Sequence, residues 1–289
     1  MGAAGRTGAC GVRPTVRQDI REPLPEGLGQ AIRETAGDIA ALVRGVPDTT
    51  VPVPGSEWTL GEAAAHLALA NELMADLAAG RERPYGDGTP QSLAAANEQS
   101  LATYGERRAD PLAAVITEQA DAFLAAVARA AADPTARDTP LVTPLGPLTR
   151  PVLASYLLTH MLGHGYDLAR AVKRPHMIDP DRVGLCMPFM LSVMPRVADA
   201  AATAGLTARY TVRLRGGTAF GVTLADGTVR VTAEPQERPD CTILIEPVAF
   251  LLVALGRRSP WPAMARGQIV AWGRKPWLAP RFPNLFTAP

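Results

Sequence analysis

The chain has 289 residues, which is enough for two domains of ordinary size. Hydrophobic residues make up 47% of it and charged residues 20%, a composition typical of globular proteins and not of disordered ones. Its 29 basic and 28 acidic residues leave a net charge of +1, with the arginines spread along the chain. We therefore expect no nucleic-acid partner, because such a surface needs a clustered basic excess.

The three cysteines, Cys10, Cys186 and Cys241, are odd in number, far apart and outside any CxxC motif. We expect no disulfide framework and a reducing, cytoplasmic environment. Cys186 and Cys241 lie in apolar runs, so we interpret them as small core residues and not as nucleophiles. No segment approaches the roughly 20 apolar residues of a membrane helix, so no membrane association is expected. Residues 1–21 lack the apolar core of a signal peptide and are predicted to form a flexible tail.

The first half of the chain has the periodicity of helices. Thr59 and Glu62 have the spacing of a capping box, which predicts the start of a helix at Thr59. Helices are predicted over residues 26–44, 59–79, 89–107, 111–132 and 149–172, the third being the lesser one. Four long helices joined by loops indicate a four-helix bundle, with domain bounds of 22–177.

The pattern changes in residues 178–289. One more helix is expected over residues 181–204, before strands with alternating apolar residues around 210–214, 220–224, 229–231 and 241–245. Gly216-Gly217 and Asp226-Gly227 have the composition of hairpin turns. Helices over 247–255 and 260–266 and a short strand over 268–272 complete an α+β domain, whose sheet we expect to be antiparallel.

Three of the four histidines occupy inward positions on predicted helices. His160 and His164 are four residues apart, so both project from one helix face, which continues an apolar stripe. His66 lies on the apolar face of another long helix. A single histidine in such a place is more often a hydrogen-bonded core residue, and for the His160 and His164 pair alone the two interpretations balance.

The third histidine favours a metal ion over core packing. Three imidazoles and a water would form an open site for zinc or a related first-row ion. Asp167, one turn beyond His164, could orient an imidazole, with a helix-end charge as the equal alternative. Met161 stands where a zinc protease motif has its Glu, and the chain has no GxSxG elbow, no phosphate loop and no GxGxxG after a strand.

Two segments, WTLGEAAAHL at residues 58–67 and HMLGHGYDLARA at residues 160–171, resemble the ligand-bearing helices of the mycothiol-dependent maleylpyruvate isomerase family. This family belongs to the DinB-like four-helix metalloproteins. Residues 209–286 are similar to sterol-carrier-type domains, notably in the stretches DCTI, LLVALGR and RFPNLF. The resemblance covers residues 22–289, and the order of the two domains is its most specific feature.

The resemblance implies a metal site on three positions of this chain. The family's usual ligands are a His on the second helix and a Glu and a His four residues apart, which correspond here to His66, His160 and His164. His160 replaces the usual Glu and removes one negative charge, which changes the Lewis acidity of a bound ion, so the family's reaction does not carry over automatically.

As a function, the resemblance implies a metal-dependent enzyme that uses a low-molecular-weight thiol, with mycothiol as the candidate. The thiolate would attack an electrophilic substrate in S-transfer or in a cis/trans isomerisation. Arg170 is the candidate cofactor contact, with a helix-end surface charge as its alternative.

Two further functions stay open. Trp261, Trp272 and Trp277, together with the lack of a recognisable general base, would suit a protein that binds an apolar ligand and whose metal is structural or absent. A metal-assisted biosynthetic enzyme that needs no thiol is the other. The sequence leaves the substrate, the metal and the oligomeric state undetermined.

Overall fold

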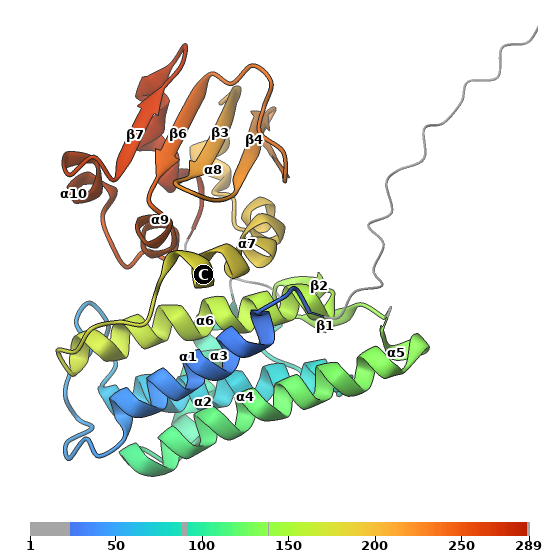
Figure 1. Cartoon of the computed structure of the whole chain (residues 1–289), viewed down its shortest axis with the longest axis vertical. Coiled ribbons are helices and arrows are strands. Elements are labelled where there is room, and N and C mark those ends of the chain that lie inside the picture. The colour runs from blue at the N-terminus through green and yellow to red at the C-terminus, as the bar shows by residue number, and fades with distance from the viewer. Residues whose placement is uncertain (1–23, 88–91, 138, 288–289) are drawn as a thin grey trace, which may run out of the picture.

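The computed structural model describes residues 24–87, 92–137 and 139–287. The predicted tail, with Cys10 in it, lies outside the described residues. Figure 1 places a group of long helices at one end of the molecule and a sheet with short helices at the other. Helix α7 lies between the two parts (Figure 1).

Four long helices form the predicted bundle, which the structure confirms. Helices α1 and α2 each pack against both α4 and α6, so they occupy diagonal corners. The bounds are Leu28–Val43 for α1, Leu60–Ala78 for α2, Ala109–Ala132 for α4 and Arg150–Ala171 for α6. The smaller elements are α3 (Leu93–Thr103), α5 (Pro134–Arg137) and an unpredicted hairpin of β1 (Leu141–Thr143) and β2 (Gly146–Leu148).

The start of α2 has the predicted capping box. Thr59 Oγ1 accepts a hydrogen bond from the Glu62 amide at 3.3 Å, and Glu62 Oε2 accepts one from the Thr59 amide at 2.8 Å. Two of the amides that a helix start leaves unpaired are satisfied in this way. The cap fixes where α2 begins, and so which helix face carries His66.

Helix α4 is the element to compare with the expectation that the chain has no membrane span. Of the described residues, only α4 forms a helix long and apolar enough to cross a membrane, judged by length and composition alone. Its apolar side packs against α1 and α2 inside the bundle.

The helix expected over residues 181–204 is shorter in the structure. Helix α7 (Pro180–Val193) is followed by the 3-10 turn η2 (Met194–Arg196) and the short α8 (Ala200–Thr203). Pro195 accounts for the break, because proline has no amide to donate to the carbonyl four residues earlier.

Helix α7 also contains Pro188, next to a contact with the bundle. The Ser155 hydroxyl of α6 donates to Leu185 O at 2.8 Å and accepts from the Phe189 amide at 3.1 Å. In a regular helix these two groups bond to each other, and here the Ser155 hydroxyl contacts both of them. Helices α6 and α7 are thereby joined through a shared hydrogen-bond network.

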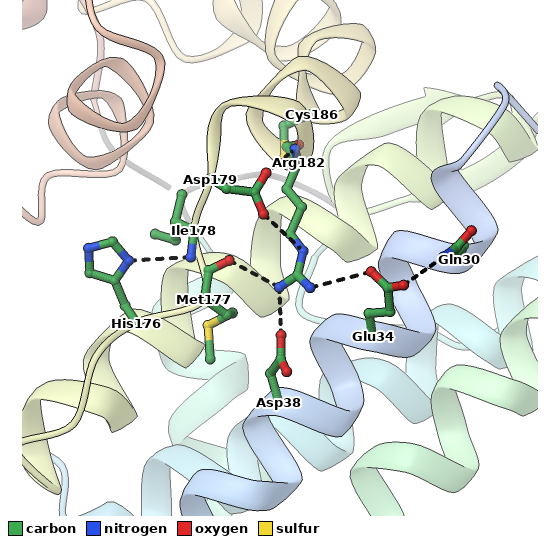
Figure 2. A network of polar contacts seen from close by, with 9 residues as sticks. All are labelled: Gln30, Glu34, Asp38, His176, Met177, Ile178, Asp179, Arg182 and Cys186. Atoms are coloured by element: carbon green, nitrogen blue, oxygen red, sulfur yellow. Dashed lines mark hydrogen bonds and ion pairs between the residues drawn. The ribbon is translucent and has the colours of Figure 1, made fainter.

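A second connection between α7 and the bundle centres on Arg182 (Figure 2). Its guanidinium lies 2.7 Å from Asp38 Oδ2 and 3.5 Å from Glu34 Oε2, both on α1. It also contacts Asp179, the N-cap of α7, at 3.4 Å. The start of α7 is therefore held against α1 by charge as well as by packing.

The second domain is an α+β domain, as predicted. Its sheet has five strands in the order β5-β4-β3-β6-β7. The strands are β3 (Ala208–Leu214), β4 (Ala219–Ala225), β5 (Thr228–Thr232), β6 (Cys241–Ile245) and β7 (Ile269–Trp272). The helical elements after β6 are α9 (Pro247–Ala254), α10 (Pro260–Ala265), η3 (Pro276–Arg281) and η4 (Pro283–Leu285).

The expectation of a wholly antiparallel sheet is wrong for one pair of strands. Strands β3 and β6 are parallel, with Tyr210 opposite Cys241. Residues 233–240 cross the sheet to make this pairing, and the Gln236 amide donates to Thr211 Oγ1 at 3.0 Å on the way. A Cβ at Gly221 would lie 2.7 Å from Glu234 O, so only glycine leaves room for the crossing chain.

Candidate metal centre

The three predicted histidines come together between α2 and α6. His66 projects from α2, while His160 and His164 project from one face of α6. One ring nitrogen from each lies within 4.8 Å of the other two. The closest approach is 3.2 Å, between Nε2 of His66 and Nε2 of His160. The structure thus brings together residues that are 94 positions apart in the sequence.

Burial keeps the three imidazoles neutral. It lowers the pKa of His66 to about 4, with a further contribution from the positive charge of Arg257. Burial also holds the pKa values of His160 and His164 well below 6.5, and the neighbouring histidines and Arg257 add to the effect. A neutral imidazole has a free lone pair, which is the form that ligates metals.

The arrangement fits a divalent cation better than it fits ordinary packing. Two facing Nε2 atoms need one proton between them to form a hydrogen bond, and the Nδ1 atom of His160 is buried without any partner among the described residues. Nitrogens bound tetrahedrally to zinc at about 2.0–2.1 Å lie a little over 3 Å apart, close to the separation of His66 and His160.

Asp167 lies beside the cluster but does not hydrogen-bond to it. Its Oδ2 is 3.7 Å from His164 Nδ1, too long for a hydrogen bond. The same oxygen accepts two hydrogen bonds from Arg257, which follows α9 in the second domain. Burial raises the pKa of Asp167, and the charge and hydrogen bonds of Arg257 oppose that rise.

Aromatic rings form part of the surroundings of the cluster. The Trp58 ring lies 4.8 Å from that of His66 and 6.0 Å from that of His164, between ring centres. Tyr156 presents an edge-on ring 6.1 Å from His160. These apolar walls lower the local polarity, which strengthens any electrostatic interaction made inside.

Arg170 lies near the end of α6, and its charge opposes the rise in the pKa of Asp167 beside the cluster. Its side chain is exposed, donates to Pro54 O at 3.2 Å, and lies over the Tyr166 ring at 5.8 Å. Cys186 and Cys241 are buried and free, in line with their interpretation as core residues. Burial raises the pKa of Cys186 to about 12 and that of Cys241 to about 11.

Three residues in or beside the surroundings of the cluster are not among the predicted site residues, namely Trp58, Tyr156 and Arg257. The position of Trp58 at the start of the His66 helix is a usable signal. Arg257 ends the stretch LLVALGR, which resembles sterol-carrier-type domains, but that stretch gives no signal of a contact with the bundle. Only the packing of the two domains brings Arg257 to Asp167.

The fold and the cluster define a two-domain protein, a four-helix bundle with a three-histidine centre joined to an α+β domain. Residues 28–169 match the family described as the mycothiol maleylpyruvate isomerase N-terminal domain, and residues 193–273 match the SCP-2 sterol transfer family. The bundle is therefore similar to the first family, and the α+β domain is similar to the second.

Solved structures give weaker likenesses. Two crystal structures of the mycothiol-dependent maleylpyruvate isomerase are 14% identical to the chain, and the match covers 86% of this chain and 93% of theirs, with TM-scores of 0.47 and 0.48. UbiJ-SCP2, described as a ubiquinone synthesis protein, is 18% identical over 30% of this chain and 75% of its own, with a TM-score of 0.26. No curated protein matches the chain.

Proposed function

We propose that the protein is a metal-dependent enzyme that uses a low-molecular-weight thiol, with mycothiol as the candidate, for S-transfer or cis/trans isomerisation. The observation that carries this proposal is the convergence of three neutral imidazoles from α2 and α6. The family that the bundle matches supports the thiol, since its description names mycothiol and an isomerase.

His66, His160 and His164 would hold the ion, which we take to be zinc. When bound, a zinc ion supplies Lewis acidity that lowers the pKa of a coordinated thiol and favours its nucleophilic thiolate. The three histidines carry no negative charge, because His160 stands where the family that the chain resembles commonly has Glu. Asp167 places a carboxylate close to these histidines, 3.7 Å from His164.

Arg257 acts as a positioning residue for this site. Its Nε and Nη2 contact Asp167 and its Nη1 donates to Leu255 O at 2.7 Å, so the guanidinium is held on both sides. Its charge favours the ionised form of Asp167 and the neutral forms of the histidines. The second domain thereby contributes to the electrostatics of a site built in the first.

The described cysteines support a thiol supplied from outside the chain. Cys186 and Cys241 are buried, and their raised pKa values leave almost no thiolate at neutral pH. A thiol-independent reaction at the same metal centre is the alternative. A reducing cytoplasm stays the predicted location, because Cys186 and Cys241 are free thiols.

The test is to measure zinc content and thiol transfer in the purified wild type, in His160→Ala and in His176→Ala. We expect about one zinc per wild-type chain and a loss of both properties in His160→Ala. His176 lies outside the cluster, in the segment before α7, so its variant serves as the matched control and should retain both. If His160→Ala keeps its zinc and its activity, the proposal is wrong.

A second candidate function is the binding of an apolar ligand, favoured by a cavity beneath the sheet. The cavity is lined almost entirely by apolar side chains from α7, the sheet and α9, including Phe189, Val212, Ile243 and Phe250. The sterol transfer family of this domain points the same way. Native mass spectrometry that finds co-purified lipid and no metal would favour this function over the enzyme.

A further inference from the structure

A single side chain, that of Tyr156, connects the wall of the apolar cavity to the three-histidine cluster. Phe189 of α7 lines the cavity, and its ring stacks on that of Tyr156 with 4.3 Å between the ring centres. Tyr156 lies one turn before His160 on α6 and meets the His160 ring edge-on, with 6.1 Å between the centres. Stacked and edge-on ring pairs attract each other in defined orientations, so a displaced Phe189 ring would disturb a proposed metal ligand through one neighbour.

Leu255, at the C-terminal end of α9, makes a second connection. It lines the same cavity. A Cβ at Gly163 would lie only 3.1 Å from Leu255 Cδ1, so the leucine side chain packs directly on the backbone of α6. Gly163 is buried and lies between His160 and His164 along the helix. A displacement of Leu255 would therefore change the packing of the helical turn that carries two of the proposed ligands.

The backbone of Leu255 is joined to the cluster as well. Its carbonyl oxygen accepts a hydrogen bond from Arg257 Nη1 at 2.7 Å, and the same guanidinium is paired with Asp167 at 3.0 Å. Asp167 Oδ2 lies 3.7 Å from His164 Nδ1. The side chain and the backbone of one cavity-lining residue thus both lead to the histidines of α6.

Phe189 and Leu255 have room to move only towards the cavity. Both are buried, with 1% and 7% of their surface exposed. The Ser155 hydroxyl holds the Phe189 amide at 3.1 Å, and α6 blocks both side chains on the side of the cluster. Protein interiors are otherwise close-packed, so the cavity is where these side chains can be displaced. A ligand in the cavity would fill that space and hold both side chains against α6.

We propose that Phe189 and Leu255 are positioning residues that couple the apolar cavity to the metal centre, so that a ligand in the cavity strengthens metal binding by the three histidines. Two ligands that order the same side chains cooperate, because the second no longer has to restrict their motion. By linkage, the metal strengthens ligand binding by the same factor. The coupling rests on the metal site and on the apolar-ligand binding proposed above, and it makes each of them depend on the other.

The experiment measures zinc affinity with and without an uncharged apolar probe, 1-octanol. Zinc would be titrated into the chelator-treated full chain in competition with a chromophoric chelator, and octanol binding would be followed by calorimetry with and without zinc. We expect saturating octanol to lower the Kd for zinc at least about fivefold, and bound zinc to lower the Kd for octanol by the same factor. Both are binding measurements and require no knowledge of the reaction.

Variants test the two connections separately. Phe189→Leu keeps an apolar wall but removes the ring that stacks on Tyr156. Leu255→Val shortens the side chain that packs on Gly163. Each variant should weaken the effect of octanol on zinc affinity, and the double variant should reduce that effect to less than about twofold.

Phe250→Leu is the matched control. Phe250 lines the same cavity, but its ring contact is with Phe220 of β4 and not with the bundle. This variant should keep the full effect once octanol is saturating. Circular dichroism shows which variants are folded, and either Phe189→Leu or Leu255→Val is sufficient for the test, because the two connections are separate.

The possible failures are distinguishable. If zinc and octanol bind independently of each other, the coupling is wrong and both proposed sites still stand. If the effect persists undiminished in the folded wall variants, octanol acts at the metal itself and the role of Phe189 and Leu255 is wrong. A chain that binds no zinc would overturn the metal-dependent function, a chain that binds no octanol would overturn the apolar-ligand function, and either result overturns the coupling.

Discussion

The guanidinium of Arg257 donates two hydrogen bonds to Oδ2 of Asp167, from Nε at 3.2 Å and from Nη2 at 3.0 Å. The two residues belong to different domains, and their side chains are only 22% and 14% exposed. Because Asp167 lies one turn from His164, this ion pair links the second domain to the three-histidine cluster.

Replacing Arg257 with Ala should destabilise the protein by about 1–3 kcal/mol, because it leaves a largely buried carboxylate without its partner. Urea unfolding measures the cost. The double variant Arg257→Ala/Asp167→Asn should be more stable than the sum of the two single changes predicts. Strictly additive costs would mean that the two side chains do not interact in solution.

The metal-free protein should lose stability as the pH falls from 6.5 towards 4. The folded-state pKa of His66 is about 4, below its ordinary value of 6.5, so in this range the unfolded chain binds a proton that the folded chain does not. The stability is therefore present above pH 6.5 and is lost as the pH approaches 4. The free energy of unfolding would be measured with urea at pH 7.5 and at pH 5, with a chelator present. Between these pH values the wild type should lose up to about 2 kcal/mol more than His66→Gln loses. Equal losses of stability in the two proteins would contradict the lowered pKa of His66.

Cys186 and Cys241 should be inert towards thiol reagents in the folded protein. Their pKa values of about 12 and about 11 suppress the thiolate, and burial blocks access. In a Cys10→Ser background at pH 8, we expect Ellman's reagent to react at least about 100-fold more slowly with the native chain than with the chain in urea. Rapid reaction of the native chain would mean that the chain carries an accessible thiol of its own.

Gly165 should tolerate no side chain. A Cβ there would lie 2.9 Å from Met177 Sδ and 3.0 Å from Ile39 Cγ1, where α1 and α6 approach each other. Gly165→Ala should cost about 1–3 kcal/mol in thermal or urea unfolding. Gly37→Ala, on α1 with nothing within 4 Å, is the matched control and should stabilise the protein by about 0.5–1 kcal/mol. A neutral Gly165→Ala would show that the two helices can separate at little cost.

The sequence predicts best what depends on neighbouring residues. The capping box at Thr59 and the helical periodicity of the bundle are local, and the structure confirms both. The inward direction of His66 follows from its helix face in the same way. The parallel pairing of β3 with β6 is not predictable from local pattern, because it depends on residues 233–240 crossing over Gly221, which no alternation of apolar residues encodes.

The candidate site likewise has residues that the local sequence predicts and residues that it does not. Residue type and helix spacing are enough to select His66, His160 and His164, and these three side chains do converge. The neighbours that set their charge cannot be selected in this way, since Arg257 reaches Asp167 only after the two domains have packed. Spacing also selects Asp167, but its hydrogen bonds are made to Arg257 and not to an imidazole.

The contact of the Ser155 hydroxyl with the backbone of α7 bears on how such proteins can be divided or recombined. The bundle family match ends at residue 169 and the sterol transfer match begins at residue 193, so nearly all of α7 lies in neither. A truncation before α7 would strip α6 of its neighbour and leave the Ser155 hydroxyl without its two partners on α7. A truncation after Val193 would keep both. The exchangeable module is therefore a bundle that carries α7 with it, and a fusion built on that boundary keeps its helices intact.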